Sequence, residues 1–202
     1  MASSFLWDML GYMTVSAYTP GPGNILSMNT TTRYGWKKGR RLILGICCGY
    51  LCDQFICTMA LYGLSHILEP ALDVLKYVGT GYMIWLAIHM MRSRPLEGGQ
   101  EKPPTFRAGF FLQLVNVKIY FYMMTLLTAY LMPNIKSLPG LFAAGLGVVA
   151  FGSVACLAWA AAGLRLHNAY LKHYKVVNLV LGLFLLYCAW NIITNPYNGI
   201  QL

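Results

Sequence analysis

The first stretch of this sequence that could do chemistry is TPGPGN, at residues 19–24 of an otherwise apolar segment. Prolines remove backbone donors and block helical bonding to earlier carbonyls, and glycines allow unusual dihedrals and close approach. We expect the motif to split a helix in two and to present bare N–H groups where the second half begins, which suits a carboxylate. The candidate binding residues are Pro20, Gly21, Pro22, Gly23 and Asn24.

A second polar interruption, QLVNVK at residues 113–118, places Asn116 and Lys118 inside a later apolar run. A lysine at mid-membrane costs at least about 2.5 kcal/mol and normally faces a cavity or a partner. Lys118 is therefore a candidate to bind a substrate carboxylate directly. Asp53 is the acid deep in another run, and two interpretations stay open for it: a structural ion pair with Lys118, or a site that carries a proton, since burial favours the protonated carboxyl.

The elements that must position these residues are membrane spans. The chain has 202 residues, of which 57% are hydrophobic and 10% charged, whereas about 25% are charged in a soluble domain. Its apolar runs are each about as long as the roughly 20 residues that a spanning helix needs. The six predicted spans are Phe5–Thr32, Leu42–Leu68, Ala71–Met91, Ala108–Met132, Leu138–Leu164 and Val176–Thr194. Turns are predicted at Glu69-Pro70, Pro133-Asn134 and Leu138-Pro139-Gly140.

These spans form two halves of three, residues 1–92 and 106–196, joined by a link at 93–105. Because three is odd, the halves lie in opposite orientations, and the first span of each half carries one of the interruptions. Matching interruptions of this kind are the best sequence pointer to a transporter binding site. The sequence thus predicts one domain over residues 1–202, an all-α membrane protein of six transmembrane helices in an inverted 3+3 repeat, with helices 1 and 4 broken or irregular.

The basic residues predict the orientation of the chain. Twelve lie in the links after spans 1, 3 and 5: Arg33, Lys37, Lys38, Arg40, Arg41, Arg92, Arg94, Lys102, Arg107, Arg165, Lys172 and Lys175. Cytoplasmic loops carry the excess of Lys and Arg, so both termini are expected outside the cytoplasm. The net charge of +9 is then a topology signal with some attraction to membrane lipid. Because no nucleic-acid-binding module accompanies it, we expect no nucleic-acid partner.

Small residues recur at four-residue spacing, at Gly45 and Gly49 and again at Gly152, Cys156 and Ala160, and predict close helix contact. The six cysteines all fall within predicted spans and are expected to pack as small hydrophobes. Since no Cys-x-x-Cys or histidine-rich ligand set is present, we expect no metal and no cofactor. The alternative class is a metal-ion or redox-electron membrane carrier. No Ser/His/Asp set or paired carboxylates favour an enzyme.

Both interruptions resemble the signatures of one family, the lysine-exporter superfamily of amino-acid exporters. The first signature is TPGPGN followed by Gly35, a basic cluster and Gly45-x-x-x-Gly49. The second is FRAGFFLQLVNVKIYFYMMT at residues 106–125, in which Val117 replaces the proline of the family's usual Asn-Pro-Lys. This second form is most similar to the cysteine and O-acetylserine exporter branch.

The resemblance implies a six-span carrier of the bacterial inner membrane that exports small amino acids or their derivatives by alternating access, in exchange for protons. Its binding motif maps onto Pro20, Gly21, Pro22 and Asn24 in the first signature and onto Asn116 and Lys118 in the second. The chain departs from the pattern at Gly23, and at Tyr50, where many members have an acid. Asp53, three residues on, lies on nearly the same helix face. The oligomeric state stays open, a homo-oligomer included.

Overall fold

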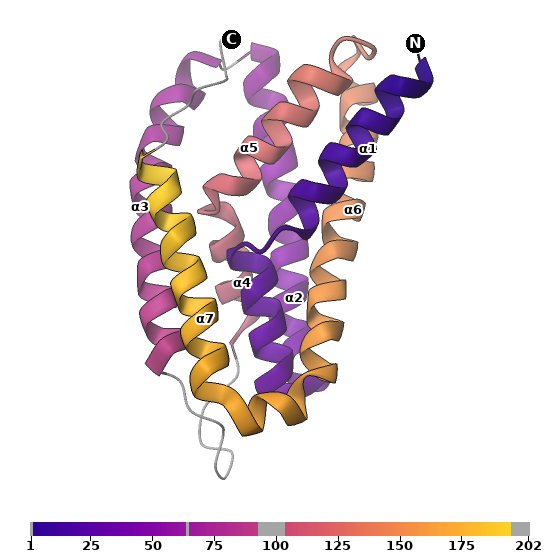
Figure 1. Cartoon of the computed structure of the whole chain (residues 1–202). Helices are drawn as coiled ribbons and strands as arrows, with labels where there is room; N and C mark the ends of the chain where they lie inside the picture. The colour runs from indigo at the N-terminus through magenta and orange to yellow at the C-terminus, as the bar shows by residue number, and fades with distance from the viewer. Residues whose placement is uncertain (1, 64, 93–103, 195–202) are drawn as a thin grey trace.

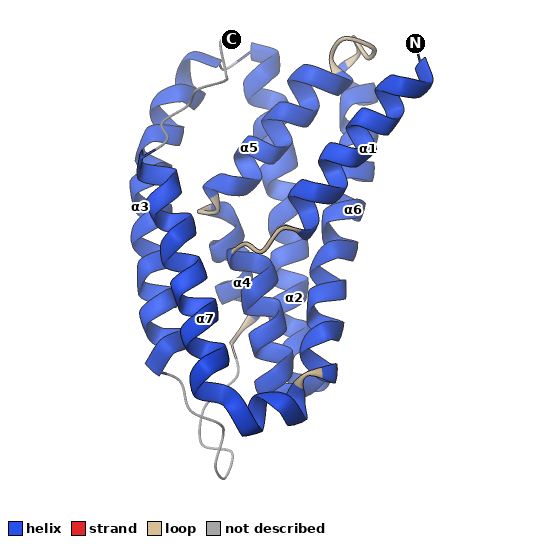
Figure 2. Ribbon diagram, viewed as in Figure 1, coloured by secondary structure: helices blue, strands red, loops and turns tan. Residues whose placement is uncertain are grey.

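A computed structural model describes residues 2–63, 65–92 and 104–194, and within these ranges it contains helices and no strand (Figure 2). Figure 1 shows the helices side by side along one long axis. Their bounds are α1 Ala2–Tyr18, α2 Pro22–Gly63, α3 Ser65–Arg92, α4 Phe106–Leu114, α5 Val117–Thr125, the π-helical η1 Leu126–Leu131, α6 Leu138–Arg165 and α7 His167–Thr194.

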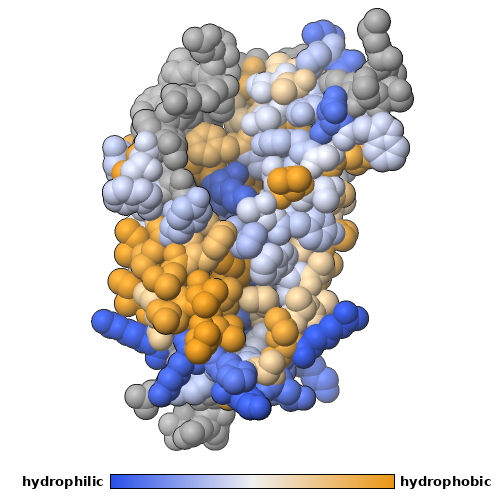
Figure 3. Space-filling view, viewed as in Figure 1, coloured by the Kyte–Doolittle hydropathy of each residue, from blue (hydrophilic) through white to orange (hydrophobic). Residues whose placement is uncertain are grey.

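The described helices include enough long, apolar ones to confirm a membrane protein. By length and composition, Pro22–Leu61, Leu138–Arg165 and His167–Trp190 can each cross a membrane. The pair Phe106–Leu114 and Val117–Leu131 adds a fourth if it counts as one bent span. Figure 3 shows a band of apolar side chains on the viewed face, with hydrophilic side chains gathered at the end where α6 meets α7. We call this end of the bundle the basic end.

Helix α2 lies at the centre, packed most extensively against α6 and α4, while α3 packs against α7. Glycine makes the α2–α4 contact possible. A Cβ on Gly45 would collide with the backbone of Phe106, and one on Gly109 with the carbonyl of Leu42. Small residues let helix backbones approach this closely in membranes. The predicted contact role of Gly45 is confirmed, and Gly152, Cys156 and Ala160 are likewise buried in α6.

The prediction of a non-helical link between spans 1 and 2 is wrong. The helix continues through the basic residues on both sides of Gly35, and α2 bends at this glycine, whose φ of 71° and ψ of 174° are not helical. Only glycine adopts a positive φ of this kind without strain. A loop was expected because basic residues usually mark membrane boundaries, but lysine and arginine are good helix formers, so the chain turns at one residue.

Three other predicted boundaries are also wrong. The expected turn at Glu69-Pro70 lies inside α3, which begins at Ser65; Pro70 stands in the second turn of the helix, where it forfeits one helical hydrogen bond without ending the helix. The sixth helix begins at His167 rather than Val176, with a kink at His173. The turn expected at Leu138-Pro139-Gly140 is likewise wrong, because these residues form the first turn of α6, where proline is favoured. The turn at Pro133-Asn134 is confirmed, whereas residues 93–103 of the predicted link lie outside the described residues.

Candidate functional site

The first break separates α1, which ends at Tyr18, from α2, which begins at Pro22. A helix end leaves carbonyls without helical partners, and inside a membrane these must be satisfied by protein. Here side chains from elsewhere supply the donors. The Asn24 amide donates to the carbonyls of Ala17 at 2.8 Å and Thr19 at 3.2 Å. The Trp159 indole N–H of α6 donates to the Tyr18 carbonyl at 3.2 Å.

The second break lies between α4 and α5, which are bent by 58° relative to each other. Two backbone hydrogen bonds between residues that are close in sequence shape this break. They run from Asn116 N–H to the Gln113 carbonyl at 2.9 Å and from Val117 N–H to the Val115 carbonyl at 3.1 Å. Asn116 holds the N-cap position of α5 but makes no side-chain cap bond. The predicted irregularity of span 4 is therefore a true break, formed without a proline.

The two breaks meet in the middle of the bundle (Figure 1). Lys118, in the first turn of α5, donates from Nζ to the carbonyl of Thr19 at 2.9 Å. Gly21 lies against the same side chain, since a Cβ there would stand 3.2 Å from Lys118 Cδ and 3.3 Å from Nζ. The structure thus brings Thr19 and Gly21 of the first motif together with Lys118 of the second.

Asp53 lies apart from Lys118. Its side chain is 0% exposed, and neither carboxyl oxygen has a hydrogen-bond partner among the described residues. The side chains of Gln113 and Tyr120 are its polar neighbours. No ion pair with Lys118 forms in the described part of the chain, where the lysine binds Thr19 instead. Of the two interpretations of Asp53, the structural ion pair is therefore absent from this conformation.

Gln113 is the residue that the sequence prediction left out of the site. Its Oε1 accepts from Asn116 Nδ2 at 3.4 Å, and the same oxygen would lie 3.5 Å from a Cβ placed on Gly23. Because it also neighbours Asp53, Gln113 touches both breaks and the buried acid. Its presence within the second motif, as a 0% exposed amide in an apolar span, is the signal that could have identified it.

Five buried polar residues follow the first break and were also missed: Ser27, Asn29, Thr30, Thr31 and Thr32. Thr31 and Thr32 donate to α6, to the carbonyls of Ala160 at 2.7 Å and Gly163 at 2.9 Å. Such bonds hold one helix against another inside a membrane. These two threonines are structural, whereas Asn29 and Thr30 face a cavity on another side of the helix.

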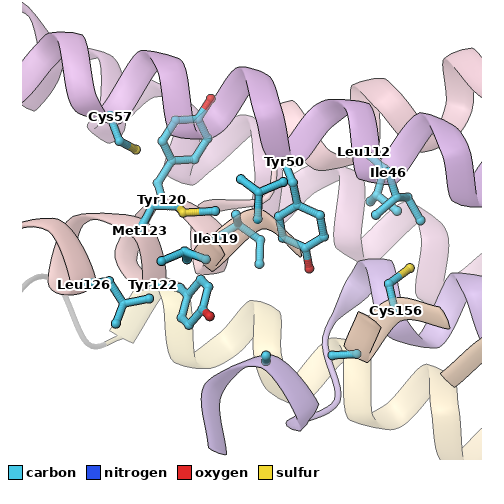
Figure 4. Close-up of a cluster of buried hydrophobic side chains, with 14 of the residues drawn as sticks. Ile46, Tyr50, Cys57, Leu112, Ile119, Tyr120, Tyr122, Met123, Leu126 and Cys156 are labelled. Atoms are coloured by element: carbon cyan, nitrogen blue, oxygen red, sulfur yellow. The ribbon is translucent and has the colours of Figure 1, made fainter. Parts of the chain in front are cut away.

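The core beside the breaks is aromatic. Figure 4 shows Tyr120 and Tyr122 of α5 and Tyr50 of α2 among aliphatic side chains and Cys156. Tyr122 stacks on Tyr12 of α1, with 6.1 Å between ring centroids. All six cysteines are free thiols within helices, as their predicted packing role requires.

Comparison with known proteins identifies the family. The family model described as LysE type translocator matches residues 14–195, which include both breaks. The chain belongs to this family. It is a transporter rather than an enzyme, and the predicted resemblance is confirmed.

Relatives of this LysE type translocator carry a more specific description. Proteins named cysteine/O-acetylserine efflux protein, from Escherichia coli (strain K12) and Shigella sonnei (strain Ss046), are each 33% identical to it over 190 residues. The matched region covers 94% of this chain and 97% of either relative. No solved structure matches the chain.

Proposed function

We propose that this translocator exports small amino acids or their derivatives, of the cysteine and O-acetylserine type, from the cytoplasm by proton-coupled alternating access. The names of its relatives support the substrate class. The observation that carries the mechanism is the bond from the Lys118 ammonium to the Thr19 carbonyl, which joins the two helix breaks.

The Lys118 ammonium occupies the place that a substrate ammonium would take. An α-amino acid brings its own ammonium to the Thr19 carbonyl and releases Lys118, which then binds the substrate carboxylate in a charge-assisted hydrogen bond. The amides at the start of α2, beside Gly23 and Asn24, lie next to the same place, and a helix N-terminus attracts negative charge. Without substrate, Lys118 therefore occupies the site itself, and the substrate enters by displacing the Lys118 ammonium from the Thr19 carbonyl.

The same arrangement favours substrates with small side chains. Gly21 leaves space for Lys118 and nothing larger, since even an added Cβ would press on Lys118 Cδ at 3.2 Å. The neighbouring positions Pro22, Gly23 and Asn24 are buried. A bulky substrate side chain would have to displace part of this packed core, which costs free energy.

In this proposal Asp53 carries the coupled proton, and Gln113 links its protonation to the second break. A buried carboxyl without partners binds a proton far more readily than it holds a charge. When Asp53 loses its proton, the carboxylate draws the Gln113 Nε2, which has no partner among the described residues, and the rotation of the amide weakens the long bond that Gln113 Oε1 accepts from Asn116 at the second break. Protonation of Asp53 reverses this rotation of the Gln113 amide, so the proton on Asp53 and the shape of the second break are linked.

For the whole chain we propose six spans in an inverted 3+3 repeat, with the basic end in the cytoplasm and both termini outside. Two observations support this arrangement. The first span of each half is a broken helix, and the third spans of the two halves, α3 and α7, pack together. Fusion of alkaline phosphatase to the C-terminus tests the orientation. The enzyme is expected to be active, since it folds outside the cytoplasm.

Counterflow in proteoliposomes tests the function. Vesicles preloaded with cysteine, O-acetylserine, threonine, homoserine, lysine or leucine receive the matching labelled compound, and exchange is expected for the small neutral ones. Lys118→Ala removes a charged hydrogen bond worth about 1.5–3 kcal/mol, so a loss of roughly 10- to 100-fold is expected. Lys38→Ala, at an exposed lysine, is the matched control. Folded protein that exchanges none of these compounds contradicts the proposal.

Asp53→Asn separates coupling from binding. The amide is nearly isosteric but takes up no proton, so exchange between equal pools is expected to continue while accumulation driven by a pH gradient is lost. A variant that still accumulates substrate under a pH gradient would remove Asp53 from the coupling step.

A further inference from the structure

Helix α6 packs closely against the part of α2 that follows the bend, residues 36–63, which we call the second limb of α2. A Cβ on Gly145 would collide with the Gln54 side chain, and one on Gly152 would stand 3.4 Å from the Tyr50 ring. These two contacts show that α6 and the second limb run antiparallel. Because the residues of α6 at this contact are small, the two helices can approach each other closely.

Two cysteines face each other further along the same contact. The thiol of Cys47, on the second limb, is hydrogen-bonded to the thiol of Cys156 on α6. Ser153, one helical turn before Cys156, is a second hydrogen-bonding neighbour of Cys47. The Ser27 hydroxyl, on the part of α2 before the bend, shares a hydrogen with Cys156 Sγ at 3.0 Å. Cys156 therefore lies where α6 meets both parts of α2.

The Cys47 and Cys156 thiols are positioned to form a disulfide. A disulfide needs Cβ atoms about 3.5–4.5 Å apart, on backbones that lie close together. Thiols in contact across two closely packed helices approach this geometry. Cys48 and Cys52 do not, since they lie one turn apart on one helix, where Cβ atoms are about 5–6 Å apart.

Exposure sets the order in which the two thiols react. Cys47 is half-buried, whereas Cys156 is 0% exposed. A small hydroperoxide therefore meets Cys47 first. The Cys47 sulfur attacks the peroxide O–O bond and becomes a sulfenic acid, with release of water. The Cys156 sulfur then attacks the sulfenic sulfur, the S–S bond forms and a second water leaves. In total, two thiols are oxidised and one hydrogen peroxide is reduced to two waters.

A disulfide at this place would fix both sides of the first break. Ile46, next to Cys47, lies against the break, since a Cβ on Gly23 would stand 3.6 Å from Ile46 Cγ2. Trp159, about one turn beyond Cys156, donates to the carbonyl at the end of α1. A bond between the two cysteines would hold α6 and the second limb of α2 together at the level where α1 gives way to α2.

We propose that Cys47 and Cys156 form a redox-active dithiol, whose oxidation to a disulfide by a hydroperoxide arrests the transporter. Formation of the disulfide rests on the contacts of the two thiols alone. Its effect on transport rests on the proposed function, because it assumes that α6 and α2 move relative to each other during export.

Differential labelling tests the disulfide without transport. Membrane vesicles with the full chain are treated with hydrogen peroxide, and the free thiols are blocked with N-ethylmaleimide under denaturing conditions. Thiols released by dithiothreitol are then labelled with a polyethylene-glycol maleimide. We expect label on Cys47 and Cys156, and a peptide in which the two are linked before reduction. Cys47→Ser and Cys156→Ala should each lose this label. Cys48→Ser, at a neighbouring half-buried thiol, should keep it.

Counterflow of O-acetylserine tests the arrest, because this compound has no thiol to consume the peroxide. In the wild type, exchange is expected to fall in proportion to the fraction of cross-linked protein and to recover after dithiothreitol. In Cys47→Ser and in Cys156→Ala, the same peroxide should leave exchange at the level of the untreated variant. Either variant is sufficient if the other folds poorly.

Three results would overturn the switch. One is folded wild-type protein that gains no label after peroxide, and another is a cross-linked protein that exchanges at its full rate. The third is inhibition by peroxide that persists in both cysteine variants, since the oxidised group would then lie elsewhere. The export function fails on a different observation, the absence of amino-acid exchange before any peroxide is added, so the two failures are distinguishable.

Discussion

The first and second helix breaks lie against each other in the centre of the bundle, but they are made from different residues. The first contains two prolines and two glycines, and its free carbonyls are bonded by Asn24, Trp159 and Lys118. The second contains no proline and is closed by two short backbone bonds around Asn116. A proline break cannot close into regular helix, whereas a break of ordinary residues can. The comparison therefore predicts a fixed first break and a movable second one.

Removal of both prolines from the first break is expected to have the largest effect. Each proline inside a helix costs roughly 3 kcal/mol or more, so Pro20→Ala with Pro22→Ala makes a continuous helix across residues 19–21 much less unfavourable. The expected result is slower amide hydrogen exchange in this segment and a strong loss of counterflow, since the Thr19 carbonyl would be taken into the helix. Pro139→Ala, in the first turn of α6, is the control. Unchanged transport would mean that the prolines do not maintain the site.

The second largest effect is expected from the two asparagines, whose substitution by alanine should lower the free energy of unfolding by different amounts. Asn24 donates to the carbonyl of Ala17, in the last turn of α1, and to that of Thr19, just beyond the helix, and the Ala17 carbonyl has no other donor described here. Asn116 makes one long side-chain bond of 3.4 Å. Asn24→Ala is expected to lower the free energy of unfolding by about 1–3 kcal/mol, the cost of an unsatisfied buried group. Asn116→Ala should cost less than about 1 kcal/mol. Unfolding in mixed detergent micelles measures both, and equal losses would contradict the asymmetry.

The sequence predicted the breaks because their causes are local. Two prolines stop helical bonding wherever the chain goes, and a lysine inside an apolar run must meet a polar partner. The helix through Gly35 and the early starts of α3 and α7 could not be predicted in this way. Basic residues, Glu69-Pro70 and polar positions before Val176 are as compatible with a helix as with a loop. Packing decides between them, of α2 against α4 and α6 and of α3 against α7.

The site was only partly predictable for the same reason. That Lys118 would lie near the first motif followed from the two-halves argument, but its partner, the Thr19 carbonyl, depends on the 58° bend of span 4. The contacts of Gln113 and the cavity beside Thr30 arise where three helices converge. A single sequence carries no periodic signal for such a convergence, so these residues became visible only in the fold.

Addition of a proline to the second break sharpens the comparison. Val117 is the first residue of α5, where proline is tolerated, and its substitution removes a single backbone bond to Val115. Val117→Pro is expected to change the free energy of unfolding by no more than about 1 kcal/mol. If this break must move, the variant will bind substrate normally but exchange it more slowly. Exchange at the wild-type rate would show that the second break is as fixed as the first.

The smallest effect is expected from Trp159, the donor to the Tyr18 carbonyl. Side-chain hydrogen bonds between membrane helices contribute about 0.6 kcal/mol on average, and Trp159→Phe removes the indole N–H while it keeps an aromatic ring. The substitution therefore isolates one of the three donors that stabilise the end of α1. A loss much above 1 kcal/mol would mean that the first break depends on α6, so that movement of α6 could open it. A loss near the average leaves Asn24 and Lys118 as the groups that maintain it, and Lys118 is the one that a substrate replaces in the proposed exchange.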